Sequence, residues 1–272
     1  MPLTSAFPLL QPSGTIALAE RGLMLHAVEF MLIVAIPVYI LLFFFAWKYR
    51  AGNTKAKYMP DWEHSKMDEL VWWAIPFEII LILGALTWSS THALAPNKPL
   101  DSARGEPPLV VQVVALNWKW LFIYPEEGIA TINYLRIPVG RPVQFEVTAD
   151  APMNSFWVPQ LGGQIYAMTG MSNVLNLEAS ETGTFAGGSA NYSGAGFAGM
   201  KFVVEAVPED EFDAWAQTTK LSANVLSDDS YTFLARPSTG DPVAYYGEVE
   251  DGLYTTIMEK YMDLLSPGAH HH

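Results

Sequence analysis

Two long hydrophobic runs dominate the first third of the chain. Residues 27–47 (AVEFMLIVAIPVYILLFFFAW) carry Glu29 as their only charge, and residues 70–88 (LVWWAIPFEIILILGALTW) carry Glu78. Each run provides the roughly 20 residues that a helix needs to cross about 30 Å of hydrocarbon. Tryptophans typical of a membrane interface lie near the ends of the runs: Trp47, Trp72, Trp73 and Trp88. The pattern predicts a transmembrane helical hairpin over residues 27–94 and disfavours the alternative, two helices buried in a soluble core.

Basic residues are concentrated in the loop between the two runs, residues 48–69. Arg21 is the single basic residue before the first run, and Lys98 is the single one shortly after the second. The loop carries Lys48, Arg50, Lys55, Lys57 and Lys66. This bias predicts a cytoplasmic loop, with residues 1–26, both termini and the rest of the chain outside. Residues 1–26 do not form a convincing signal peptide, so a processed chain, a trimmed chain and insertion by the first run are open alternatives.

After a proline-rich connector over residues 95–108, the pattern changes to short β-rich runs separated by turn residues. The runs are LVVQVVALNW, KWLFIY, IATINYLRIP, PVQFEVTA, SNVLNLEA and MKFVVEAV, all within residues 109–207. Six or more short strands in about a hundred residues predict a β-sandwich or barrel. The fold class is therefore a membrane helical hairpin followed by an external all-β domain.

A short helical region is predicted over residues 208–269. Pro208 is followed by acidic residues that suit a helix N-terminus. Residues 252–265 (GLYTTIMEKYMDLL) repeat apolar side chains at helical spacing. We interpret His270, His271 and His272 as the remnant of a tag.

Composition excludes several classes of function. The 272 residues contain no cysteine, which excludes disulfides, thiolate metal sites and cysteine nucleophiles. The net charge of −13 disfavours a nucleic-acid partner, because phosphate binding needs a basic surface. The part after residue 90 holds 21 acidic and 9 basic residues. Its acidity fits either a solvated surface or a docking face for a basic partner.

Several stretches resemble subunit II of the haem-copper respiratory oxidases, and in particular that of the bo-type ubiquinol oxidases. They are FAWKYRA (45–51), LTWSSTHAL (86–94), LNWKWLFIYPEEGIATINYL (116–135), MNSFWVPQLGGQIYAMTGM (153–171) and NYSGAGFAGMKF (191–202). The resemblance covers nearly the whole chain and implies that residues 109–207 form a cupredoxin-like sandwich. The chain departs from the bo-type pattern in having no N-terminal cysteine for lipidation.

The resemblance also locates a copper site that this chain does not keep. In cytochrome c oxidases the subunit II domain holds two coppers with two cysteines, two histidines, a methionine and a backbone carbonyl. The corresponding positions here are Asn154, Ser189, Ser193, Phe197 and Met200. Met200 alone is a side-chain ligand of that set, and hydroxyls replace the thiolates that copper electron-transfer sites require. We therefore expect no metal or other cofactor in this chain.

By the same resemblance, the chain is an accessory subunit of an enzyme that oxidises ubiquinol, reduces O2 to water and pumps protons. A lipid-soluble quinol can pass electrons directly to haem, so no external copper relay is needed. Haems, catalytic copper and most of the quinol site are expected in subunit I, with subunits III and IV and membrane lipid as further partners. The expected location is the bacterial cytoplasmic membrane, with the cupredoxin domain on the periplasmic side.

Carboxylates of the second run are candidates for proton transfer. The resemblance places Glu69 at the entrance of a proton pathway into subunit I, since a carboxyl at the membrane boundary can exchange protons with water. The alternative is an ordinary acidic residue at a helix N-terminus, which suits Asp68 better. Glu78 lies nearly half-way along the second run and faces away from Glu69; we expect it to be protonated or paired with a group of subunit I. Glu29 is expected to reach the interface or to pair there.

Three alternatives are kept. The chain could be a membrane-anchored cupredoxin that carries electrons with copper at Met200, a cytochrome c oxidase subunit II, or a structural assembly protein. Trp118 and Trp120 match an aromatic stretch that carries the electron-entry tryptophan in cytochrome c oxidases. We interpret them here as core and interface side chains.

Overall fold

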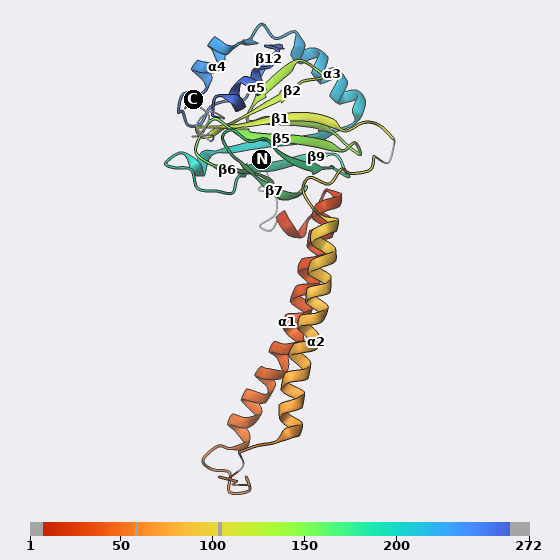
Figure 1. The fold of residues 1–272 in the computed structure, drawn as a ribbon, viewed down its shortest axis with the longest axis vertical. Helices are drawn as coiled ribbons and strands as arrows, with labels where there is room; N and C mark the ends of the chain where they lie inside the picture. The colour runs from red at the N-terminus through yellow and green to blue at the C-terminus, as the bar shows by residue number, and fades with distance from the viewer. Residues whose placement is uncertain (1–7, 58, 62, 103–104, 262–272) are drawn as a thin grey trace, which may run out of the picture. The chain divides into compact units, whose positions relative to one another are not determined.

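The structure is a computed structural model that describes residues 8–57, 59–61, 63–102 and 105–261. Its contacts divide the chain into a helical unit, residues 21–94, and a second unit made of residues 1–20 and 95–272. Two long apolar helices precede a β-sandwich with short C-terminal helices (Figure 1). The predicted fold class is therefore confirmed.

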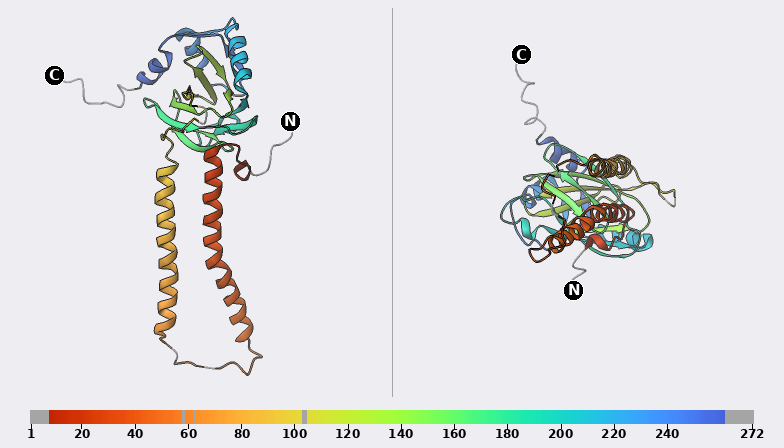
Figure 2. Two further views of the ribbon diagram at one scale, coloured as in Figure 1. Left: turned by 90° about the vertical axis from the view of Figure 1, so that its right-hand side faces the viewer. Right: turned by 90° about the horizontal axis from the view of Figure 1, so that it is seen from below.

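Two helices make up the predicted hairpin, and each is long and apolar enough to cross a membrane. Helix α1 spans Thr15–Lys48, so it begins well before the predicted run, and α2 spans Lys66–Ala93 (Figure 2). Ser65 caps α2, because its Oγ accepts a hydrogen bond from Asp68 N at 3.4 Å. Ala17 is the single buried residue of α1, and α2 has none. The apolar surface of both helices is thus free to contact lipid or other chains.

Two sheets form the sandwich. The six-stranded sheet has the order β12 (Ala244–Tyr246), β3 (Ile129–Ile132), β2 (Lys119–Tyr124), β1 (Leu109–Leu116), β5 (Val143–Ala149), β8 (Asn173–Leu177). The five-stranded sheet has the order β4 (Tyr134–Pro138), β10 (Lys201–Val207), β9 (Gly183–Ser189), β6 (Asn154–Val158), β7 (Gly162–Ala167). The β1–β5 and β4–β10 pairs are parallel, and the other pairs in these two sheets are antiparallel.

The run 129–138, expected to be one strand, is divided at Asn133. This residue has a left-handed φ of 55°, which asparagine tolerates better than most side chains. Its Oδ1 accepts a hydrogen bond from Trp120 N at 2.9 Å, and its Nδ2 donates to Asp241 O at 3.0 Å. The kink sends β3 into the six-stranded sheet and β4 into the other.

Two hydrophobic cores lie on the two faces of the six-stranded sheet. The first fills the sandwich and contains Trp120, Phe122, Phe156 and Phe202 among its large side chains. The second joins the outer face of β1–β3 to residues of the C-terminal region, including Tyr231. Strand β2 is buried at every position, which explains why KWLFIY reads as continuous rather than alternating.

The C-terminal region covers the outer face of that sheet. It consists of α3 (Glu209–Lys220), β11 (Val225–Leu226), α4 (Asp228–Leu234), β13 (Glu248–Val249) and α5 (Leu253–Glu259), with β11 and β13 paired. Helices were predicted at the positions of α3 and α5, but α4, which Ser227 caps, was not. The spacing of apolar residues suggested a helix as far as residue 265, but α5 ends at Glu259. Residues 262–272, including the proposed tag at 270–272, lie outside the described residues.

Candidate functional site

Asn154 and Ser189, two of the five positions implied for copper, are in direct contact. Asn154 begins β6 and Ser189 ends β9, and the pairing of these strands brings their side chains together. Ser189 Oγ donates a hydrogen bond to Asn154 Oδ1 at 2.8 Å. Asn154 is 1% exposed, and its Nδ2 donates to Pro152 O at 2.7 Å. The polar atoms at these two ligand positions therefore satisfy one another.

The backbone of Met200 is hydrogen-bonded to Ser189, one member of this pair. Ser189 N donates to Met200 O at 3.3 Å, and the Met200 side chain is buried in the sandwich core. Phe197 begins a single 3-10 turn, Phe197–Gly199, and its ring packs edge-on against Tyr192 with 5.6 Å between ring centres. The structure thus brings Asn154, Ser189 and Met200 together, while the Phe197 ring packs against another aromatic side chain.

Trp118 holds the loop between Ser189 and Met200 in place. Its indole N–H donates to Ser193 O at 3.1 Å. At Gly196, a Cβ would lie 2.3 Å from Cδ2 of the Trp118 ring, so this close approach requires glycine. The Ser193 hydroxyl is buried, and no described residue hydrogen-bonds to it. Side-chain packing and a hydrogen bond from Trp118 therefore maintain this loop.

These five residues do not fit a dinuclear copper centre. An amide, two hydroxyls and a phenyl ring replace the imidazoles and bridging thiolates, and the remaining thioether is a weak ligand by itself. Within the described residues, no group of three or more His, Asp or Glu side chains could hold a metal ion either. No electron-transfer step can be derived through a copper at this position.

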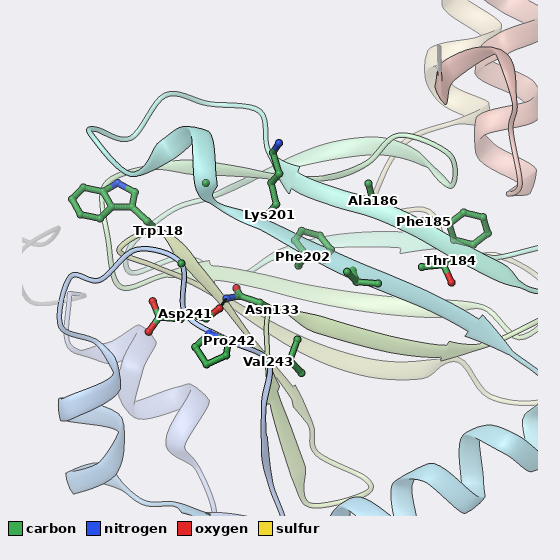
Figure 3. Close-up of a pocket in the computed structure, with 13 residues that line it drawn as sticks. Trp118, Asn133, Thr184, Phe185, Ala186, Lys201, Phe202, Asp241, Pro242 and Val243 are labelled. Atoms are coloured by element: carbon green, nitrogen blue, oxygen red, sulfur yellow. Dashed lines mark hydrogen bonds between the residues drawn. The ribbon is translucent and has the colours of Figure 1, made fainter. Parts of the chain in front are cut away.

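A cavity of about 740 Å³ adjoins the same loop (Figure 3). Trp118, Phe185 and Phe202 line it on the sheet side, and residues 240–243 line the opposite side. Lys201 and Asp241 are its titratable lining residues. With mainly apolar walls, this hollow is suited to binding an apolar surface rather than to acid–base chemistry.

Glu69 lies in the first turn of α2, the second of the two helices that are long and apolar enough to cross a membrane. Its side chain is 46% exposed, and its Oε1 lies 3.7 Å from Nδ1 of His64, which is also exposed. The two side chains therefore lie within ion-pair distance of each other at the start of α2. Glu78 lies in the middle of α2, and Glu29 lies within α1; both are exposed.

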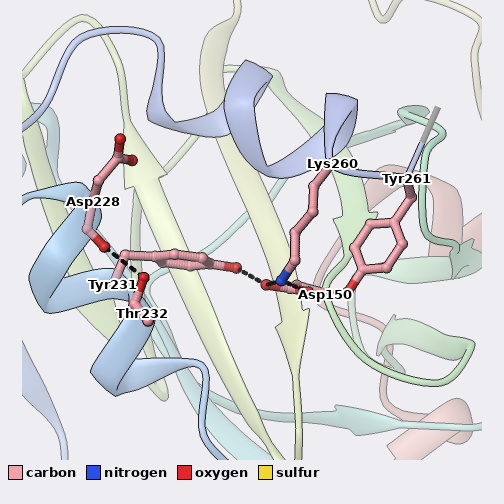
Figure 4. Close-up of polar contacts among 6 residues, drawn as sticks. All are labelled: Asp150, Asp228, Tyr231, Thr232, Lys260 and Tyr261. Carbon is pink, nitrogen blue, oxygen red and sulfur yellow. Dashed lines mark hydrogen bonds and ion pairs between the residues drawn. The ribbon is translucent and has the colours of Figure 1, made fainter. Parts of the chain in front are cut away.

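A polar cluster surrounds Asp150, and no pattern in the sequence indicated it (Figure 4). The Asp150 side chain is 2% exposed and follows the end of β5. Tyr231 Oη donates to it at 2.7 Å, Lys260 Nζ at 2.9 and 3.0 Å, and Tyr261 Oη donates as well. Burial and the hydrogen bond to Asp150 raise the pKa of Tyr231. Burial alone would lower the pKa of Lys260, but the hydrogen bond and charge of Asp150 outweigh it and raise this pKa.

Two family models match the second unit of the chain. The model described as "Cytochrome C oxidase subunit II, periplasmic domain" matches residues 128–207, and the "COX Aromatic Rich Motif" matches residues 220–263. Cytochrome bo(3) ubiquinol oxidase subunit 2 of Pseudomonas putida is 51% identical over 93% of this chain and 80% of its own length. Ubiquinol oxidase subunit 2 of Acetobacter aceti is 48% identical over 93% of this chain and 82% of its own length. The chain belongs to the ubiquinol oxidase subunit 2 family.

For this member of the subunit 2 family, the matched ranges coincide with the features described above. Residues 128–207 include all five positions implied for copper, and residues 220–263 include α4, α5 and Lys260. Among solved structures, the periplasmic domain of subunit II of cytochrome oxidase of Bradyrhizobium japonicum is 24% identical over 42% of this chain and 94% of its own, with a TM-score of 0.40. The two family models and the Pseudomonas putida and Acetobacter aceti relatives confirm the resemblance indicated by the sequence.

Proposed function

We propose that the chain is the membrane-integral subunit 2 of a respiratory enzyme that oxidises ubiquinol, reduces O2 to water and pumps protons. Within that enzyme it would bind no redox metal and serve assembly and proton entry. The observation that carries the proposal is the hydrogen bond of 2.8 Å between Ser189 and Asn154. It joins two positions where a soluble-cytochrome oxidase would need copper ligands.

The electron donor follows from this replacement. An enzyme that accepts electrons from a soluble cytochrome needs a metal relay outside the membrane, and softer ligands than these would be required to hold one. A quinol dissolves in the lipid and can deliver electrons to haem inside the membrane subunit. The proposal therefore assigns haems and copper to subunit I and leaves subunit 2 without electron transfer.

The exposed apolar helices support an integral position in a complex. With almost no buried residue of their own, α1 and α2 require lipid and other transmembrane helices around them. Subunit I is the proposed main partner, with subunits III and IV as further neighbours. The basic loop 48–69 would face the cytoplasm of a bacterium, and the sandwich would face the periplasm.

Glu69 is the proposed entrance for protons on the cytoplasmic side. Its contact with His64 at 3.7 Å and its exposure support a role in collecting protons from water. Its place in the first turn of a membrane-capable helix would allow transfer towards a neighbouring subunit. Asp68, in the same turn, has its backbone N–H bonded to Ser65 Oγ and fits the ordinary N-terminal role better.

The test uses the complex purified in mild detergent. We expect ubiquinol to support O2 uptake, reduced soluble cytochrome not to, and no absorption band of a dinuclear copper centre. The variant Asn154→His, Ser189→Cys, Ser193→Cys, Phe197→His should gain such a band when copper is supplied. Oxidation of the soluble cytochrome with a copper band in the unaltered complex would overturn the proposal. A folded quadruple variant that binds no copper would refute the assignment of these positions.

A further inference from the structure

Glu78 is an ionisable group in the middle of α2 that the proposed function does not use. It is the only charged residue from Leu70 to Trp88, and it lies about 12 Å along the helix from Leu70 at 1.5 Å per residue. Its side chain is exposed, and no described residue forms a hydrogen bond or ion pair with it. A carboxylate at such a depth in a membrane is costly and normally pairs with another group.

Within the described part of the two long helices, no basic side chain lies at the depth of this carboxylate. Residues 30–47 of α1 contain no charged side chain. Lys48 follows them, at the end of α1 that is proposed to face the cytoplasm. Tyr39 lies at a similar depth, eight residues before Trp47, but a phenol carries no positive charge at neutral pH. A positive partner for Glu78 must therefore come from another polypeptide.

The surroundings of Glu78 on its helix favour close contact with a second helix. At about 100° per residue, Ala74 and Ala85 lie on the same face, four residues before and seven residues after. Small side chains allow transmembrane helices to approach closely. Glu69 is nine residues away and lies about 180° around the helix. The Glu78 face is thus distinct from the side on which protons would enter.

We infer that the face of α2 bearing Ala74, Glu78 and Ala85 docks a transmembrane helix of another subunit, and that a basic side chain of that helix pairs with Glu78. The pairing compensates the charge that lipid cannot solvate. It rests on the proposed function in one respect, namely that α2 spans the membrane within a complex. It places a contact surface on the side of α2 opposite Glu69.

The experiment compares variants of the intact complex during stepwise increases in detergent concentration. Glu78→Leu and Glu78→Gln should both lose a subunit at detergent concentrations that the unaltered complex survives, because either change leaves the partner's cation unpaired. Glu29→Leu is the matched control: its carboxyl lies near the end of a span and can reach the interface, so we expect no loss. The subunit that dissociates identifies the partner.

Three results would overturn the inference. The first is that Glu78→Leu holds every subunit as firmly as the unaltered complex. The second is that the Glu78→Gln complex retains every subunit while the Glu78→Leu complex loses one, since the partner would then need a hydrogen bond and no charge. The third is that Tyr39→Phe reproduces the loss, since the partner would then lie in this chain. Absence of the chain from a ubiquinol-oxidising membrane complex would instead refute the proposed function.

Discussion

Lys260 Nζ lies 2.9 Å from Asp150 Oδ1, and this contact joins residues 110 positions apart. It connects the end of α5 to the end of β5, the strand that lies between β1 and β8. Tyr231 of α4 reaches the other oxygen of the same carboxylate. Asp150 therefore fastens two separate helices of the aromatic-rich region to the sandwich.

Replacing Asp150 with Ala should release this region. The change leaves the hydroxyl of Tyr231 without its acceptor in a site where the residue is 6% exposed, at a cost of about 1–3 kcal/mol. Hydrogen exchange should become faster in α4 and α5 and stay unchanged in β6 and β9. Asp213→Ala, an exposed acidic residue of α3, is the control and should leave both regions unchanged. If hydrogen exchange in α4 and α5 is as slow in the Asp150 variant as in the unaltered protein, Asp150 does not fasten these helices.

Alkaline pH should weaken the same region through Tyr254. Burial raises the pKa of Tyr254 from 10.0 to about 12, although a hydrogen bond with Ser172 acts in the opposite direction. Between these values the unfolded chain loses a proton that the folded chain keeps, so stability falls as pH rises. The contribution is complete below pH 10 and lost as pH rises through 12. Melting temperatures of the solubilised protein across this range measure the slope.

The variant Tyr254→Phe isolates this contribution. Its stability should decline less steeply between pH 10 and 12, by the equivalent of one proton, while other buried tyrosines still titrate. Tyr192→Phe is the control, because Tyr192 is 75% exposed and its removal should leave the slope unchanged. An identical slope in the Tyr254 variant would show that its hydroxyl does not titrate differently in the folded chain.

The loop between Ser189 and Met200, which carries positions implied for copper, should be sensitive to the addition of a single methyl group. Gly196→Ala places a Cβ 2.3 Å from the Trp118 ring, so either the loop or the indole must move, which typically costs about 1–3 kcal/mol. Gly199→Ala is the matched control, because a Cβ added there would have no atom within 4 Å other than those of its chain neighbours. We expect a lower melting temperature and faster proteolysis of the loop in the first variant alone. Equal melting temperatures would mean that Trp118 does not hold the loop.

Local patterns were sufficient for the elements that bury continuous apolar runs. The two long helices and strands such as β1 and β2 follow from length and hydrophobicity. Strands β6, β7 and β9 were not among the predicted runs, and in the case of β9 the sequence GTFAGGS resembles a turn. Its Gly187 is required by packing: a Cβ there would lie 2.1 Å from the Phe202 ring. A glycine selected by a neighbouring aromatic ring cannot be distinguished from a turn glycine in sequence alone.

The positions implied for copper could be predicted from the sequence, but the Asp150 cluster could not. Family resemblance located Asn154 and Ser189, and the strand pairing of β6 and β9 explains why positions 35 apart meet. The Asp150 cluster had no sequence signal, since an aspartate, a lysine and two tyrosines at long separations are common in any chain. Such clusters depend on tertiary contacts that local propensity does not encode.

Replacing Glu69 with Gln should slow the enzyme without dissociating it. The amide keeps the size of the side chain but cannot carry a proton from water, so ubiquinol-dependent O2 uptake should fall by on the order of tenfold or more. Asp68→Asn provides the control in the same helical turn and should retain the full rate. Equal rates of O2 uptake for the Glu69 variant and the unaltered complex would remove this carboxylate from the proton path, and a loss of subunit 2 from the complex would assign it to assembly instead.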